Sequence, residues 1–490
     1  MNLDLLTIAI LAAAALLYLA LLPGRARGWA LLAGSVVAIY WLQPALPIRF
    51  SDFILPTTTL GLTLLSWYLT RPGSLQPTRL TRDDRLTLLV IAGLVLLLSL
   101  NRFLPADYRL TPSRPPSPLL VALALLAGGA LIAGLGRLLQ KRRQWWVLTG
   151  LITLIAALFI LLKTEPLATL VSGWWRGLTG QDTSLASAID LNWLGFSYVA
   201  FRLIHTARDR QTGLLPELSL REYVTYVIFF PSFVAGPIDR AERFVGDFRA
   251  LPAMERWGGG DPGRVPLAAS RITLGLFKKF VIADTLAQGM ALNATNVSQV
   301  TNTPGLWLLL YGYALRLYFD FSGYTDIAIG LGLLFGIKLP ENFNRPYLRS
   351  NITKFWQSWH ITLSDWARFY VFSPLSRSLL RRQPRPSPTL IVLASQVATM
   401  VVIGLWHGVS WHFLLWGLWH GLALFAHKQW SDRTRKWYRG LKQKPRQMQA
   451  WTLFTWFFTL QYVVIGWVWF VVPDVGLAAQ TVARLFGLGW

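Results

Sequence analysis

Five of the six histidines in this chain lie within residues 360–427, in a stretch that is otherwise apolar and rich in tryptophan. An ionisable side chain buried in such surroundings costs about 3 kcal/mol, so these histidines are functional candidates. The pentapeptide Gly-Leu-Trp-His-Gly occurs twice, with His407 in the first copy and His420 in the second. The two are about 220° apart around a continuous helix, so one helix could not direct both to a single site. His407 directly follows a long apolar run and is the deeper candidate.

A further histidine lies in residues 350–372, which are predicted as an amphipathic helix. At helical spacing, Trp356, His360 and Ser364 share one face, away from a stripe of apolar side chains. The residues before this helix are rich in proline and asparagine. Such polar, irregular backbone is tolerated at membrane depth only where it lines protein or a water-filled cavity. We therefore predict a re-entrant segment near 338–386 around a central funnel.

The composition places these residues in a membrane protein. The 490-residue chain is 53% hydrophobic and 14% charged, more apolar surface than a soluble core of this size can bury. Runs long enough to cross about 30 Å of hydrocarbon recur along the chain. They occupy residues 5–22, 29–46, 52–70, 86–101, 118–139, 145–163, 265–293, 305–337, 388–406, 411–427 and 451–473. The expected fold class is an all-α polytopic helical bundle with about 10–12 membrane helices. The first run follows Asp4 and no basic residue, which predicts a retained helix.

The residue types limit the chemistry. The chain has no cysteine, which excludes a cysteine nucleophile, a thiolate metal site and a disulfide. It also has no serine nucleophile elbow, no phosphate-binding P-loop and no paired-histidine zinc motif, and no metal site is expected. An enzyme with this sequence would rely on histidine, carboxylate, hydroxyl and backbone groups.

The chain is strongly basic, with 47 Lys and Arg against 23 Asp and Glu and a net charge of +24. In the N-terminal half, basic residues fall in every second loop: Arg25 and Arg27; Arg71, Arg79, Arg82 and Arg85; and Lys141, Arg142 and Arg143. The exception is the intervening loop with Arg102, Arg109 and Arg114. Because basic loops favour the cytosolic side, the N-terminus is expected to be extracytoplasmic. Further basic clusters at 240–249, 278–279 and 377–385 either bind anionic lipid or steer an acidic soluble partner. Nucleic acid is not expected, since no soluble domain is long enough to bind it.

Several motifs follow one another in residues 191–427. They are GFSYVAFRLI (195–204), FFPSFVAGPIDR (229–240), LYFDFSGYTDIAIGLGLLFGIKLPENFNRPY (317–347), FWQSWHITLSDW (355–366) and GLWHG (404–408). In this order they resemble the membrane-bound O-acyltransferase (MBOAT) family. The third and fourth are most similar to its alginate O-acetylase branch, whereas FRLIHTARDRQTG and GPIDRAERF are more similar to its D-alanyl transfer branch. We accordingly divide the chain into N-terminal membrane helices (1–185), a catalytic core (186–430), and a C-terminal loop with a final membrane helix (431–490).

The resemblance implies that His407 and His360 occupy the two catalytic-site positions of the family. Acyl transfer from a thioester to a hydroxyl needs a base, and neutral imidazole suits that role near neutral pH. We expect His407 to deprotonate or orient the acceptor hydroxyl. We expect His360 to polarise the thioester carbonyl, bind the oxyanion or hold the acceptor. Further candidates for the site or its channel are Trp406, Asn344, Arg345, Ser364 and Asp320. Of these, Asn344 and Arg345 could equally satisfy backbone groups, and Asp320, like Asp326, could equally make internal polar contacts.

The expected function is an O-acyltransferase of the inner or plasma membrane that moves an acyl group from a cytosolic thioester to a hydroxyl outside. The donor, acetyl-CoA or an acidic acyl carrier protein, is a substrate, and no tightly bound cofactor is expected. The other expected partners are an envelope polymer, an extracytoplasmic acyltransferase or relay protein, and the lipid bilayer. Acetyl transfer to polysaccharide and D-alanine transfer to teichoic acid both remain open. The alternative is a membrane transporter in which His407, His412 and His420 form a cation path.

Overall fold

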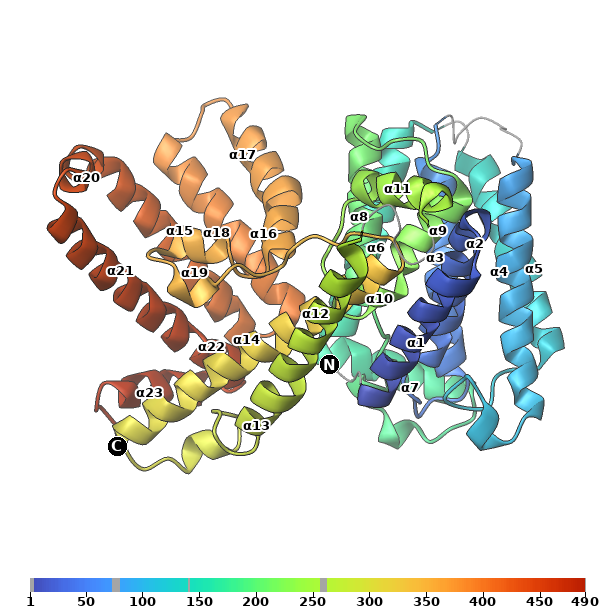
Figure 1. The fold of residues 1–490 in the computed structure, drawn as a ribbon, viewed down its shortest axis with the longest axis horizontal. Helices are drawn as coiled ribbons and strands as arrows, with labels where there is room; N and C mark the ends of the chain where they lie inside the picture. Colours follow the sequence, from blue (N-terminus) through green and yellow to red (C-terminus); the bar gives the residue numbers. More distant parts are fainter. Residues whose placement is uncertain (1–3, 73–79, 140–141, 256–261, 490) are drawn as a thin grey trace. The chain divides into compact units, whose positions relative to one another are not determined.

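The computed structural model describes residues 4–72, 80–139, 142–255 and 262–489, and within these ranges every regular element is a helix (Figure 1). All eleven predicted apolar runs lie mainly in helices, which confirms the all-α fold class. Arg79 and Lys141, two of the loop cations noted above, lie outside the described residues. The chain divides into two compact units. The first contains residues 1–270 and 328–339, and the second contains residues 271–327 and 340–490.

The first unit is built mainly from the N-terminal helices. They are α1 (Leu5–Leu21), α2 (Gly24–Trp41), α3 (Ser51–Thr70), α4 (Arg82–Ser99), α5 (Pro118–Leu139), α6 (Gln144–Lys163), α7 (Glu165–Leu178), α8 (Phe196–Thr212), α9 (Leu220–Ile228), α10 (Phe230–Phe233) and α11 (Ala241–Ala250). Helices α2, α3 and α8 pack around the short α9. Helix α5 is peripheral: Leu119, Leu126 and Leu138 are 71–77% exposed, as expected for side chains that face lipid.

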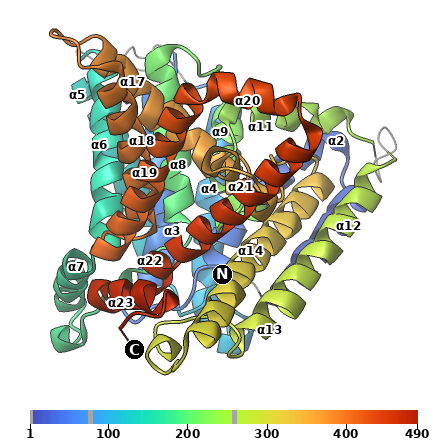
Figure 2. The same cartoon turned by 90° about the vertical axis from the view of Figure 1, so that its left-hand side faces the viewer.

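The second unit contains the C-terminal helices. They are α13 (Asp284–Ala287), α15 (Ile352–Trp356), α16 (Ile361–Ala367), α17 (Ser373–Leu380), α18 (Pro388–His407), α19 (Trp411–Arg433), α20 (Arg435–Lys442), α21 (Pro445–Gly466), α22 (Val468–Val471) and α23 (Val475–Leu485). Two helices contribute to both units, α12 (Arg264–Leu276) and α14 (Thr303–Leu334). Short π-helical segments at Phe277–Ala283 and Arg368–Phe372 follow α12 and α16. Helices α18 and α19 lie side by side (Figures 1 and 2).

Six helices in the described part of the chain are both long and apolar enough to cross a membrane. They are Ser51–Thr70, Arg82–Phe103, Pro118–Leu139, Gln144–Lys163, Pro388–His407 and Pro445–Val471. The number is lower than the predicted 10–12 because the remaining runs form shorter or more polar helices. Helix α1, for example, has only 17 residues, and the sequence of the continuous helix α14 includes the charged residues Arg316, Asp320 and Asp326. The protein is nonetheless a polytopic helical membrane protein.

The doubled pentapeptide forms the contact between α18 and α19. A Cβ added to Gly404, the first residue of one copy, would lie 2.3 Å from Phe413 O and 3.4 Å from the Cα of Gly417, the first residue of the other copy. A Cβ added to Gly417 would lie 2.7 Å from Met400 O. Only glycine allows the two backbones to approach this closely. The two copies lie on separate helices, as the separate apolar runs 388–406 and 411–427 predicted, because α18 ends at His407 and the chain turns before α19.

The predicted helix over 350–372 is broken between α15 and α16. His360, just before α16, has φ of 43°, a left-handed conformation that is strained for a residue with a side chain. Ile361 N donates a hydrogen bond of 2.9 Å to Asn342 O, which ties the break to a distant segment. The aromatic spacing correctly predicted helical turns on both sides, but this long-range contact overrides the helix at His360.

Candidate active site

A small cavity in the second unit is lined by both candidate histidines. Its volume is about 40 Å³, enough for a few water molecules. His360 and His407 contribute the titratable groups of the lining, and the rest is apolar or aromatic, including Phe321, Trp416 and Phe470. Two imidazoles therefore line one largely apolar cavity.

His407 is the last residue of α18, and its ring is held by aromatic side chains. The ring centroids of Trp406 and Phe470 lie 4.6 and 4.7 Å from that of His407, and those of Trp416 and Phe413 lie at 5.6 and 5.8 Å. The helix end explains why the ring can project into the cavity. The next residue, Gly408, leaves the helical path.

His360 is held from the other side by polar and aromatic contacts. Its Nδ1 lies 3.1 Å from Oδ1 of Asn342, and its ring is 4.7 Å from that of Phe321 in an edge-on contact. His360 is only 2% exposed, and its Nε2 has no hydrogen-bond partner among the described residues. His407 lines the same cavity as His360. The two histidines therefore form one site.

The other candidate residues are distributed unevenly around this site. Trp406 lies next to both histidines, with its ring 6.0 Å from that of His360. Ser364 is near in sequence, but its Oγ donates to Trp359 O at 3.3 Å. Asn344 and Arg345 are exposed and do not line the cavity. Arg345 has φ of 46°, so its backbone, like that of His360, is in the strained left-handed region.

Asp320 and Asp326 make internal ion pairs, as one of the two interpretations of the sequence expected. Asp320 pairs with Lys279, and Asp326 pairs with Lys278 and Arg271. The lysines come from the π-helical segment after α12, which approaches α14 closely because glycines meet there. A Cβ on Gly275 would lie 2.5 Å from Gly323 O. Asp320 is therefore committed to Lys279 and does not line the cavity.

The remaining histidines of the C-terminal region lie elsewhere. His412 Nδ1 is 3.0 Å from Trp469 O, and His427 Nδ1 is 2.9 Å from Thr353 Oγ1. His420 is fully buried against the rings of Trp356 and Trp416. None of the three lines the cavity. Of the two Gly-Leu-Trp-His-Gly copies, only the first therefore contributes its histidine to this site.

Asn342 is the residue that the sequence analysis missed. It is completely buried and contacts His360, whereas the selected Asn344 is exposed. No local pattern distinguishes the two asparagines, because the contact depends on a chain reversal between residues 342 and 360. The one available signal was Pro340, which disfavours a helix through this segment.

The fold and the cavity thus define a polytopic helical membrane protein in which a buried and a partly buried histidine line one cavity. The model of the MBOAT, membrane-bound O-acyltransferase family, matches residues 142–469. The chain belongs to this family, and both histidines lie within the matched region.

Individual relatives agree with this assignment. The chain is 34% identical over 270 residues to a "Peptidoglycan O-acetyltransferase" of Helicobacter pylori, covering 54% of this chain and 47% of that protein. It is 32% identical over 269 residues to a "Teichoic acid D-alanyltransferase" of Streptococcus thermophilus, covering 54% and 64%. It is 33% identical over 299 residues to a "Probable alginate O-acetylase AlgI" of Azotobacter vinelandii, covering 60% and 54%. The matched regions thus span from about half to under two thirds of these relatives.

Proposed function

We propose that the protein is a membrane O-acyltransferase that moves an acyl group from a thioester to a hydroxyl of a cell-envelope polymer or relay protein. The observation that carries this proposal is the single cavity shared by His360 and His407. Imidazole can accept the proton of an attacking hydroxyl, and a second imidazole can stabilise charge on the carbonyl oxygen. The reaction needs no covalent intermediate, which is consistent with a chain that has no cysteine.

The basic surface that could receive the donor is smaller than the sequence suggests. In two of the three predicted clusters, the basic side chains form ion pairs within the protein. The arginines of residues 240–249 pair with Asp209, Glu222, Asp239, Glu242 and Asp247. The lysines of residues 278–279 pair with Asp320 and Asp326. In the third cluster, Arg377, Arg381, Arg382 and Arg385 are all exposed. The loop that joins α17 to α18 is therefore the part of these clusters best suited to an acidic carrier.

The position of this loop favours a donor with an extended arm. The loop lies directly before α18, and His407 is the last residue of that helix. Because α18 has 20 residues, the loop and His407 are about 30 Å apart along the helix. A thioester at the end of a long flexible chain, as in coenzyme A or a phosphopantetheinyl carrier protein, could bridge such a distance. In this arrangement the loop faces the cytosol, the protein lies in the plasma membrane, and the N-terminus is extracytoplasmic.

The acyl group itself is left open by the relatives, because acetyl- and D-alanyl-transferring proteins match the chain at nearly the same identity. The decisive experiment incubates the purified protein in nanodiscs with labelled acetyl-CoA or with a labelled D-alanyl carrier protein. We expect one donor to lose its acyl group to a hydroxyl-bearing acceptor, and the His407→Gln variant to leave it intact. If neither donor is consumed faster than with His407→Gln, the proposed function is wrong.

The transporter alternative has no support. A cation path through His407, His412 and His420 would need the three rings to line one passage. His412 is instead engaged by a backbone carbonyl, and His420 is enclosed by tryptophans. The described residues also contain no group of three or more His, Cys, Asp or Glu arranged to hold a metal ion.

A further inference from the structure

A second, open pocket of the second unit lies between residues 348–354 and the first turns of α21. Its volume is about 590 Å³, within the range of small-molecule sites. None of its lining residues also lines the histidine cavity. We propose that this pocket binds the headgroup of an anionic phospholipid.

The charge of the lining is entirely positive. Arg349 and Lys354 are its ionisable residues, and no Asp or Glu contributes to it. Lys354 is exposed, and within the described residues only its backbone takes part in hydrogen bonds. Arg349 donates from Nε and Nη2 to Asn344 O, at 3.2 and 2.6 Å, which leaves its Nη1 hydrogens available to a ligand. Two cations with available donors can bind a phosphate.

Hydrogen bonds fix both walls of the pocket. On one wall, Asn351 caps α15 by accepting from Lys354 N at 2.8 Å. On the other, Trp456 of α21 donates from Nε1 to Tyr347 O at 2.8 Å, directly before Leu348 of the lining. Helix α15 also contributes Trp356 to the histidine cavity. A headgroup bound to Lys354 would therefore stabilise a helix that lines the candidate active site.

The apolar side of the pocket continues into a surface suited to an acyl chain. Leu453 lines the pocket, and Leu453, Phe454, Phe457 and Phe458 of α21 are 56–63% exposed. They form two pairs of residues spaced by one helical turn, so the apolar surface runs along α21. This helix lies in a segment that is long and apolar enough to cross a membrane. A phospholipid fits both features, a bound phosphate and an adjacent acyl chain, whereas a soluble phosphate fits only the first.

The pocket lies at an end of the unit where basic residues collect. Residues 433–446, which include α20 and lead into α21 (Figure 2), contain no acidic residue. Their exposed cations are Arg433, Arg435, Lys436, Arg439, Lys442, Lys444 and Arg446. Basic segments next to membrane helices attract the anionic lipids of the cytosolic leaflet.

The packing of α18 and α19 places this basic segment on the same side as the arginine loop before α18. A Cβ added to Gly417 would lie 2.7 Å from Met400 O, and one added to Gly421 would lie 2.9 Å from Val397 Cα. The two helices are therefore antiparallel, and the end of α19 lies beside the start of α18. The proposed function places this side in the cytosol, where the leaflet is anionic.

The test measures lipid binding to the purified full-length protein in dodecyl maltoside by native mass spectrometry. The probes are phosphatidylglycerol and, as a zwitterionic lipid with the same chains, phosphatidylcholine. We expect phosphatidylglycerol to bind more tightly and to raise Tm, since it stabilises the folded state that binds it. Lys354→Gln should weaken this binding by about fivefold and Arg349→Gln/Lys354→Gln by about 25-fold, because each cation beside an anionic headgroup contributes about a factor of five.

Two further variants separate the pocket from general surface charge. Lys436→Gln, the matched control, removes an exposed cation of the basic segment that does not line the pocket. It should change the affinity for phosphatidylglycerol by less than about twofold, because solvent and salt screen it. Thr452→Trp keeps both cations but fills the pocket, and should weaken binding as much as the double variant does.

The proposal is overturned if Lys436→Gln weakens binding as much as Lys354→Gln, if Thr452→Trp binds like the parent, or if phosphatidylcholine binds equally well. The phosphates of a soluble donor are the other source of the same chemistry. If coenzyme A displaces phosphatidylglycerol from the parent at equal concentration, the pocket binds the donor and the assignment to lipid is wrong. Should the double variant not fold, Lys354→Gln and Thr452→Trp decide. Because binding and Tm are measured without turnover, a protein that transfers no acyl group can still bind the lipid, and the two proposals fail separately.

Discussion

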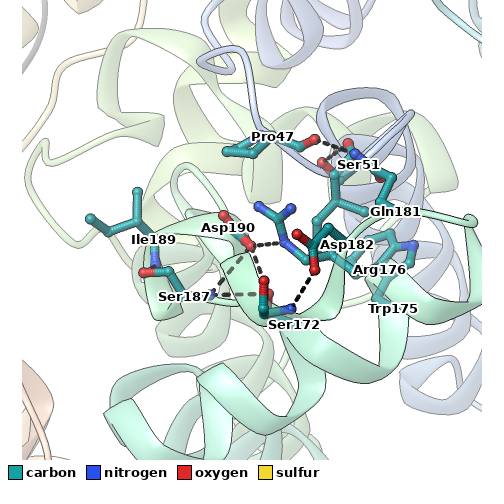
Figure 3. Close-up of polar contacts among 12 residues, drawn as sticks. Pro47, Ser51, Ser172, Trp175, Arg176, Gln181, Asp182, Ser187, Ile189 and Asp190 are labelled. Atoms are coloured by element: carbon teal, nitrogen blue, oxygen red, sulfur yellow. Dashed lines mark hydrogen bonds and ion pairs between the residues drawn. The ribbon is translucent and has the colours of Figure 1, made fainter.

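Two buried polar clusters of this protein differ in how completely their hydrogen bonds are made. In the first unit, Asp190 Oδ2 accepts from Ser172 Oγ and from Arg176 Nε, each at 2.6 Å (Figure 3). No side-chain atom of these three residues is a buried donor or acceptor without a partner in the described ranges. In the second unit, by contrast, His360 Nε2 and Asn342 Nδ2 are both buried and unpaired.

The difference separates two uses of buried polarity. A fully paired cluster fixes the chain locally, and the segment around Asp190 is tied further to the loop after α2 through Gln181, whose Nε2 donates to Pro47 O at 2.9 Å. An unpaired buried group instead costs about 1–3 kcal/mol, and one that lines a cavity can recover this energy from a bound substrate. The comparison predicts that the first cluster governs stability and the second governs turnover.

The largest expected effect is on the two histidines of the cavity. His360→Gln and His407→Gln should each lower acyl transfer by about 10²–10⁴-fold, with melting temperatures near that of the parent. Since the two rings share one site, the double variant should be little slower than the slower single variant. Turnover of a labelled thioester and thermal unfolding, measured on the same preparations, check this. Losses that multiply would show that the rings act in separate places.

A smaller effect, on KM for the donor, is expected when exposed arginines are replaced. Here a surface cluster without ion pairs in the described residues is compared with a paired arginine. Replacing Arg377, Arg381, Arg382 and Arg385 together with Gln should raise KM for an acidic carrier protein by about tenfold at low salt and hardly at all at high salt. Arg249→Gln is the control, because Arg249 is paired with Glu222. It should leave KM unchanged at either salt concentration. Equal changes at both salt concentrations would exclude electrostatic docking at this loop.

The sequence predicted the helices better than it predicted the geometry around the two candidate histidines. Apolar runs and helical spacing depend on local residues, and they placed α3 through α6 and α18 within a few residues. The break at His360 could not be predicted, because an aromatic stripe has the same spacing whether or not one residue between its turns is left-handed. Asn342 was missed for the same reason: its role comes from contacts with His360 and Thr362, which lie far along the chain.

The doubled pentapeptide illustrates the same limit. The repeat is evident in the sequence, but its structural role, the close packing of two antiparallel helices, depends on the contact between Gly404 and Gly417. The sequence placed the two copies near two successive apolar runs, 388–406 and 411–427, and helical angles indicated only that one continuous helix could not direct His407 and His420 to a single site. The two histidines do lie in different surroundings, but the cause is the chain reversal after His407.

A moderate effect on stability alone is expected in the paired cluster. Burial raises the pKa of Asp190, but hydrogen bonds from Arg176 and Ser172 and the positive charge of Arg176 outweigh it, and the pKa lies below its ordinary value. The stabilisation is therefore present above the unfolded pKa of about 3.9 and is lost as the pH falls through the lower folded value. Asp190→Asn should lower Tm by several degrees at pH 7 and leave kcat unchanged.

The pH dependence provides the check on that variant. Between pH 7 and pH 3, Tm of the parent should fall more than Tm of Asp190→Asn, so that the two curves approach each other in acid. Asp182→Asn serves as a control nearby in the chain, because Asp182 is exposed and its carboxylate accepts a hydrogen bond from Ser184 N at 2.8 Å. A parallel pair of curves for the parent and Asp190→Asn would mean that the ion pair does not contribute to stability.

The smallest effect is expected at His420, which tests the comparison most severely. Both of its ring nitrogens are buried without a partner in the described residues, so by unpaired atoms alone His420 would resemble His360. It differs because it does not line the cavity and is enclosed by the rings of Trp356, Trp416 and Tyr462. A substrate in the cavity could not reach His420, so its unpaired nitrogens lower the stability of the fold without contributing to substrate binding.

Replacing His420 by an aromatic side chain without polar atoms should therefore be tolerated. His420→Phe removes two unsatisfied groups from an aromatic enclosure, a change that is nearly neutral or stabilising when the shape is kept. We expect turnover within about twofold of the parent and Tm unchanged or slightly raised, measured beside His407→Phe, which should be inactive. A stable but inactive His420→Phe would show that an unpaired buried histidine can matter without access to the cavity, and the distinction between the two clusters would then fail. An active and more stable His420→Phe would restrict the functional meaning of unpaired polar atoms to those that line a cavity.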